Sequence, residues 1–167
     1  MRKERKSLTV TAALAGTISL SGVAEARNLM LPPVPGFVEG YRQTQGQNAI
    51  LELVPRGQNV NNYTKMVTMQ RVAGTRVPAN RFLAEFARRY QASCPRAAVL
   101  AQPMGVAGGV RLDCPRHPRT GRTETVLARA IDDGTGIYLV HFTFKYIPAP
   151  GETRWARDYL GRVGFTN

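Results

Sequence analysis

The chain is poor in the side chains on which most metalloproteins and many enzymes depend. It has two cysteines and two histidines in 167 residues, and the cysteines do not form a Cys-x-x-Cys pair. It also lacks a phosphate-binding glycine loop, a Gly-x-Ser-x-Gly turn and a His-Glu-x-x-His motif. These absences give no support to a metal site, a bound cofactor or a hydrolase with a standard motif. We therefore expect no metal and no cofactor, and the sequence favours a protein that is not an enzyme.

Long apolar runs are also missing, because no stretch reaches the roughly 20 residues that a membrane-spanning helix needs. The weakly apolar stretch Leu8–Leu20 follows a short basic head and precedes Ala24–Ala26, which places small residues where a signal peptidase cleaves. This pattern predicts a bacterial signal peptide over residues 1–26, with cleavage between Ala26 and Arg27. The mature protein is then periplasmic or secreted, without a transmembrane segment. An ordinary N-terminal helix is the alternative.

Lysines and acidic residues are scarce in the predicted mature chain, so arginine dominates its charge. Removing residues 1–26 takes away four of the 23 basic and two of the 11 acidic residues, which leaves a net charge of +10. Lys65 and Lys145 are the remaining lysines. A basic surface attracts anionic partners, so we expect an envelope component such as a lipid headgroup or an acidic glycan, or another envelope protein, rather than nucleic acid. The alternative is charge spread evenly, which binds nothing in particular.

Apolar periodicity predicts one domain over residues 37–167, preceded by an extended leader over residues 27–36. The order of elements is β-β-β-α-β-β-β-β-α, and short turns between successive strands make most neighbours antiparallel. We therefore predict an α+β protein, in which an antiparallel sheet of about six to seven strands is packed by two amphipathic helices. The expected strands are 37–44, 48–54, 66–72, 97–104, 110–114, 123–131 and 136–147, and the expected helices are 78–93 and 152–163.

Cys94 and Cys114 are expected to form a disulfide bond. Cys94 ends the apolar stripe of the first helix, and Cys114 has the same strand parity as Val110 and Leu112. Both sulfurs should therefore lie on the buried side, where a bond would join the helix end to a strand. An oxidising compartment favours this bond over two free thiols. A redox-active pair is the further alternative, but the spacing does not support it.

Two places carry candidate functional side chains. His141 lies on the last predicted strand, on the face opposite a row of aromatic residues, and in a groove it would be a candidate acid or base. A structural histidine is the alternative. The basic segment 116–122 is a candidate ligand-binding loop because arginine presents a planar fork to phosphate or carboxylate, although it also fits a solvated loop. The candidate residues of this segment are Arg116, His117, Arg119 and Arg122.

Residues 52–70 resemble a group of small exported proteobacterial proteins without an established activity. The shared features are Glu52–Pro55, in the pattern Glu-x-Val-Pro, and Tyr63–Thr68, in the pattern Tyr-Thr-x-Met-Val-Thr, together with a helix that ends in Cys94–Pro95. This resemblance implies no catalytic residues. The expected architecture is also similar to the PsbP-type α/β/α sandwich, whose members are often accessory or binding proteins, although a fold does not determine a function.

The Tyr63–Gln70 run has two interpretations of its own. In the first, Tyr63 anchors a turn onto the sheet and the run is architectural. In the second, its polar side chains line a groove. The members of that second set are Tyr63, Thr64, Thr68 and Gln70.

Taken together, these features favour a non-catalytic exported domain that binds an anionic or envelope partner. One alternative is a small hydrolase or lyase that uses His141, which requires a concave site with a shifted pKa. The other alternative is an accessory subunit of an envelope assembly, which requires an exposed apolar patch or an unpaired sheet edge.

Overall fold

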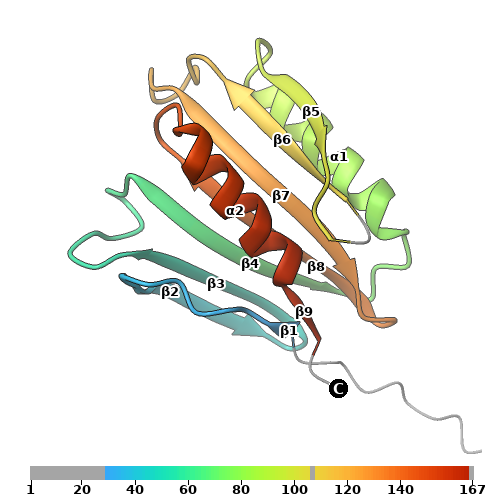
Figure 1. The fold of residues 1–167 in the computed structure, drawn as a ribbon. Coiled ribbons are helices and arrows are strands. Elements are labelled where there is room, and N and C mark those ends of the chain that lie inside the picture. The colour runs from blue at the N-terminus through green and yellow to red at the C-terminus, as the bar shows by residue number, and fades with distance from the viewer. Residues whose placement is uncertain (1–28, 106–107, 166–167) are drawn as a thin grey trace, which may run out of the picture.

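The computed structural model describes residues 29–105 and 108–165 (Figure 1). The predicted signal peptide over residues 1–26, with its cleavage site at Ala26 and Arg27, lies outside the described residues. In the part that is described, no helix is long and apolar enough to cross a membrane.

Seven of the strands form one antiparallel sheet. In chain order these strands are β2 (Phe37–Gln45), β3 (Asn48–Pro55), β4 (Lys65–Ala73), β5 (Ala98–Gln102), β6 (Gly109–Cys114), β7 (Glu124–Asp132) and β8 (Gly136–Phe144). Their spatial order is β2-β3-β4-β8-β7-β6-β5. The predicted α+β class is confirmed, and the long-range pairing of β4 with β8 joins the two halves of the chain at the middle of the sheet.

Two helices cover opposite faces of this sheet (Figure 1). The first, α1 (Ala79–Ser93), packs over β6 and β7, where Val126 is buried. The second, α2 (Pro150–Arg162), packs over the aromatic row of β8, where Phe142 is buried. Successive residues of a strand point to opposite faces, so the two cores alternate along β8. The α2-side core includes Val140, Phe142, Phe144, Ala156, Tyr159 and Leu160.

The boundary between β8 and α2 differs from the prediction. The strand ends at Phe144, short of residue 147, and the helix begins at Pro150, before residue 152. The Glu152 carboxylate stabilises the helix start by accepting the Ala149 N–H at 3.2 Å, and it holds the connecting segment by accepting the Tyr146 hydroxyl at 2.7 Å. A proline in the first helical turn is also favourable, because its missing N–H would have no partner inside the helix.

The described part of the leader packs onto the domain. The short strand β1 (Leu29–Met30) pairs with β9 (Gly164–Phe165) in a separate two-stranded sheet. Further along, Val34 is 8% exposed and belongs to the α2-side core. The leader, predicted to have no core of its own, therefore contributes to the core of the domain.

Cys94 and Cys114 form the predicted disulfide bond, with their Cα atoms 6.2 Å apart. Both residues are buried, together with Ala97. The bond joins the end of α1 to β6, so it holds the helix against the face of the sheet that it covers.

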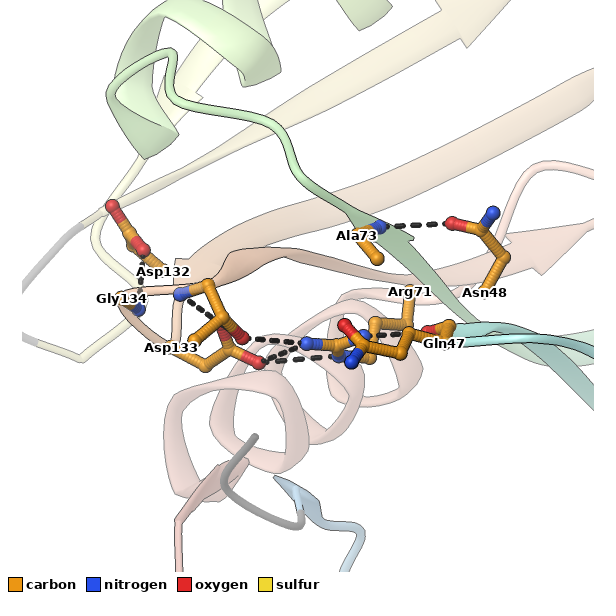
Figure 2. Close-up of polar contacts among 8 residues, drawn as sticks. Gln47, Asn48, Arg71, Ala73, Asp132, Asp133 and Gly134 are labelled. Carbon is orange, nitrogen blue, oxygen red and sulfur yellow. Dashed lines mark hydrogen bonds and ion pairs between the residues drawn. The ribbon is translucent and has the colours of Figure 1, made fainter. Parts of the chain in front are cut away.

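A buried ion pair ties β4 to the turn between β7 and β8 (Figure 2). Nε and Nη2 of Arg71 donate to Oδ2 of Asp133 at 3.1 and 2.9 Å, and the two side chains are 5% and 0% exposed. Arg71 also donates to the carbonyl oxygen of Gln47 in the β2–β3 turn, and Asp133 accepts hydrogen bonds from Thr135. Two turns that are distant in sequence are thereby held to one strand.

The two edge strands of the large sheet differ in how well they are protected against pairing with a further strand. β2 carries the charged residues Glu39 and Arg42, which form an ion pair, and its register with β3 shifts just after Glu39. Both features discourage another strand from pairing with this edge. On β5 there is no charged residue, and Val99 and Leu100 are 39% and 47% exposed. Among the described strands, β5 therefore has a free edge of the kind that the accessory-subunit alternative requires.

Candidate functional site

Both sequence candidates, His141 and the basic segment 116–122, line one cleft on the α1 side of the sheet. An inner cavity of about 220 Å³ is lined by His141, and an outer cavity of about 540 Å³ adjoins it. We call the two together the polar cleft. The residues that line both cavities are Tyr63, Arg119, Thr120 and Lys145.

Strand pairing brings the walls of the polar cleft together. The N–H of Lys145, just after β8, donates to the carbonyl oxygen of Thr64 at 2.8 Å, which places the loop between β3 and β4 beside the end of β8. Cys114 pairs with Glu124 in the β6–β7 register, which closes the loop 115–123 at the same end of the sheet. The cleft thus depends on three segments that are far apart in the sequence: the loop between β3 and β4, the loop 115–123 and the residues just after β8.

A hydrogen-bonded network of Tyr90, Glu124 and Lys145 forms one side of the inner cavity. The Tyr90 hydroxyl donates to Oε1 of Glu124 at 3.0 Å, and the Lys145 ammonium donates to Oε2 of the same carboxylate. Burial and the neighbouring Glu124 charge raise the pKa of Tyr90. Burial by itself would lower the pKa of Lys145. The hydrogen bond to Glu124 and the negative charge of this carboxylate have the larger combined effect, so the pKa of the lysine is raised. Glu124 is 8% exposed, so the carboxylate at the centre of this network is buried.

The Lys145 ammonium also lies over the ring of Tyr63, 5.1 Å from the ring centroid. This cation–π contact connects the loop between β3 and β4 to the network. Tyr63 therefore anchors its turn onto the sheet and lines the polar cleft as well. Two of the other groove candidates do not line the polar cleft: Thr68 is 3% exposed within the sheet, and Gln70 lines a neighbouring cavity along α1.

His141 lies on the face opposite the aromatic row, as predicted. Its ring stacks against Phe86 of α1 with the centroids 5.7 Å apart, and its Nδ1 lies 3.3 Å from Oγ1 of Thr143. Burial lowers the pKa of His141 to about 4, against the smaller opposing effect of Glu124. The imidazole is therefore neutral at pH 7. A concave site with a shifted pKa is the condition that the hydrolase or lyase alternative requires.

Because the pKa of His141 is lowered in the folded protein, we expect the protein to become less stable as the pH falls. Between pH 6.5 and about 4 the unfolded chain binds a proton at this histidine and the folded chain does not. The free energy of unfolding should therefore decrease by about 3 kcal/mol as the pH falls through this window. Urea denaturation at a series of pH values measures the slope. His141→Gln should flatten this slope. An equal slope in the His141 variant would contradict the prediction.

The basic segment is a closed turn whose shape is set by His117. The carbonyl oxygen of His117 accepts the N–H of Gly121 at 2.8 Å, and its own N–H donates to the Arg122 carbonyl oxygen at 2.8 Å. The N–H of Arg119 donates to the imidazole Nδ1 at 3.3 Å. Gly121 has a φ of +66°, which a residue with a side chain rarely adopts. The turn thus presents its arginine side chains from a constrained backbone.

The four candidates of this segment differ in position. His117 and Arg119 line the inner cavity, and Arg119 and Arg122 line the outer cavity. Arg116 is exposed and lines neither cavity. Across residues 29–105 and 108–165, no acidic side chain forms an ion pair with any of the three arginines. Their charge is therefore available to a ligand.

Sequence reasoning missed several residues of the polar cleft. Strand parity places Lys145 on the same face as His141, and this signal would have been enough to add it to the site. No local signal marks Tyr90, Glu124, Asn61 or Asn62, because the pairing of distant strands brings them there. Tyr90 in particular reads as one more apolar position of the helix stripe.

Among the described residues, no three His, Cys, Asp or Glu side chains lie together in a way that could hold a metal ion. Comparisons of the chain with family models, with curated proteins and with solved structures gave no match. The resemblance of residues 52–70 to small exported proteins therefore stays a prediction.

Proposed function

We propose that this domain is a non-catalytic binding module for an anionic ligand, and that the polar cleft is its binding site. The observation that carries this proposal is the position of Arg119 and Arg122. Both line the outer cavity, and neither has an acidic partner in the described chain. A guanidinium binds phosphate or carboxylate through two parallel hydrogen bonds.

The charges of the polar cleft indicate where an anionic group binds. Lys145 already donates to Glu124, so the charge of this lysine is neutralised within the protein. The unneutralised charge belongs to Arg119 and Arg122 at the outer cavity, where Asn61 and Asn62 supply further polar groups. The anionic group therefore binds in the outer cavity, and the inner cavity receives whatever group is attached to it.

We further propose that binding takes place outside the cytoplasm, in the periplasm or after secretion. The disulfide between Cys94 and Cys114 supports this location, because such bonds persist in oxidising compartments. The predicted signal peptide over residues 1–26 is in keeping with it. A phosphate- or carboxylate-bearing component of the cell envelope is the partner that this location and this chemistry favour.

Replacing both cleft arginines should abolish most of the binding of a simple anion. The double variant Arg119→Ala/Arg122→Ala is expected to bind ethyl phosphate at least about tenfold more weakly than the unchanged protein, because charge-assisted hydrogen bonds are lost. Isothermal titration calorimetry at low ionic strength measures the affinity, and added salt should weaken it.

The matched control is Arg154→Ala/Arg162→Ala, which removes the same charge from exposed positions of α2, on the other side of the sheet. This variant should bind ethyl phosphate as the unchanged protein does. Equal losses in the two double variants would mean that net charge, and not the polar cleft, attracts the anion. Absence of binding by the unchanged protein would reject the proposed function.

A further inference from the structure

The polar cleft continues into an apolar cavity along the side of α1. This third cavity, of about 360 Å³, is joined to the inner cavity by Phe86, which lines both. Its lining is apolar at Phe82 and Phe86 of α1 and at Val72 and Leu139 of the sheet, and polar at Gln70, Glu85 and Arg89. The inner and the third cavity therefore follow one another along the helix, and the outer cavity adjoins the inner one at its far end.

The order of the side chains along β8 and α1 shows in which direction this path runs. Along one face of β8 and just beyond its end, the side chains run in the order Leu139, His141, Thr143 and Lys145. On α1, Phe82, Phe86 and Tyr90 are each four residues apart, so they lie on one side of the helix. The path covers about 12 Å along the helix and about 20 Å along the strand.

The two ends of this path differ in the main character of their lining. At one end Phe82, Val72 and Leu139 supply most of the lining, with Gln70, Glu85 and Arg89 at its margin, and at the other end are the guanidinium groups of Arg119 and Arg122. His141 lies between them in its neutral form. Because His141 carries no charge at neutral pH, a hydrocarbon chain can pass this side chain without desolvating an ion.

The apolar end is open because α1 covers only part of this face. Its buried contacts are with β6, β7 and β8, so Phe82 and Phe86 are only partly buried on the side that faces β4. Partly exposed aromatic rings that continue a lined cavity mark a surface that gains free energy when it is covered.

We propose that the ligand of this protein is an anionic amphiphile, whose phosphate or carboxylate binds at Arg119 and Arg122 and whose single hydrocarbon chain lies along Phe86 and Phe82. This inference rests on the proposed function and adds the second half of the ligand. The charge at one end and the apolar lining at the other match the two parts of such a molecule, and a free polar anion would leave the apolar cavity unused.

The test compares probes that share a head group and differ in chain length. Ethyl phosphate, octyl phosphate and octanol are titrated by calorimetry below the concentration at which micelles form. Each buried methylene should tighten binding about threefold to fourfold, so octyl phosphate is expected to bind at least tenfold more tightly than ethyl phosphate. Octanol, which has no charge, should bind much more weakly than octyl phosphate. Octanoate is the fourth probe, and the tighter of octanoate and octyl phosphate identifies the preferred head group.

Two variants separate the chain-binding part from the anion-binding part. Phe82→Ser and the nearly isosteric Val72→Thr alter the apolar cavity and leave the arginines in place. Both should lower the affinity for octyl phosphate at least threefold and leave that for ethyl phosphate unchanged, which also shows that the variants are folded. Arg119→Ala/Arg122→Ala should weaken both probes.

The possible failures are distinguishable. If ethyl phosphate binds and octyl phosphate binds no more tightly, the amphiphile inference is wrong and the proposed function stands. If the apolar-cavity variants lose no more of the octyl phosphate affinity than of the ethyl phosphate affinity, the chain does not lie along α1, and the inference is again wrong. If neither phosphate binds, the proposed function fails and the inference fails with it.

Discussion

Replacing Asp133 with alanine is expected to lower the free energy of unfolding by about 3–5 kcal/mol. The substitution removes the carboxylate that faces the Arg71 guanidinium and leaves a buried cation without its counter-charge. The carbonyl oxygen of Gln47 and the hydroxyl of Thr135 still accept hydrogen bonds from Arg71, but neither neutralises it. Urea denaturation at neutral pH, followed by circular dichroism, measures the loss.

The neighbouring Asp132 supplies the matched control for this experiment. It lies on the other side of the same turn, is exposed, and accepts a hydrogen bond from the N–H of Gly134 at 2.7 Å (Figure 2). Asp132→Ala should therefore cost about 1 kcal/mol or less. Similar losses for the two aspartates would show that the turn itself, and not the buried ion pair, accounts for the effect.

Removing the disulfide is expected to lower the free energy of unfolding by about 3 kcal/mol, since the bond closes a loop between residues separated by 20 positions. The double variant Cys94→Ala/Cys114→Ala avoids placing hydroxyl groups in a buried site. Its unfolding in urea is compared with that of the oxidised protein, and the reduced protein provides a second measurement without any change of sequence.

The disulfide also bears on the polar cleft, because it holds the end of α1 that carries Tyr90 and Phe86. Loosening this end should weaken the contact of Tyr90 with Glu124, which forms one side of the inner cavity. Without the bond, we expect weaker binding of ethyl phosphate along with the lower stability. A reduced protein with unchanged stability would show that the packing of α1 alone holds the helix in place.

The elements of the fold were predictable because each depends on a short stretch of sequence. The alternation of aromatic residues predicted β8 and the face that it buries, and the stripe that ends in Cys94 predicted α1 to within one residue. The same parity placed His141 on the opposite face and both sulfurs on the buried side, and the structure confirms these positions.

The buried charges were not predictable in this way. Asp132 and Asp133 are adjacent in a turn and look alike in the sequence, yet Asp133 alone faces Arg71, which is 62 positions away. Arg129 looks like an ordinary exposed arginine of a strand. In the structure its guanidinium is buried and donates to the carbonyl oxygens of Leu160 and Val163 at the end of α2, both at 2.9 Å.

The sequence by itself therefore determined the strands and helices, the disulfide partners and the face on which His141 lies, since periodicity and parity act over a few residues. Tertiary structure alone decided the polar cleft and its apolar continuation, because the pairing of β4 with β8 and the position of α1 bring together loops and strands from both halves of the chain. Distances across a sheet depend on which strands become neighbours, and local patterns of polarity do not encode that choice.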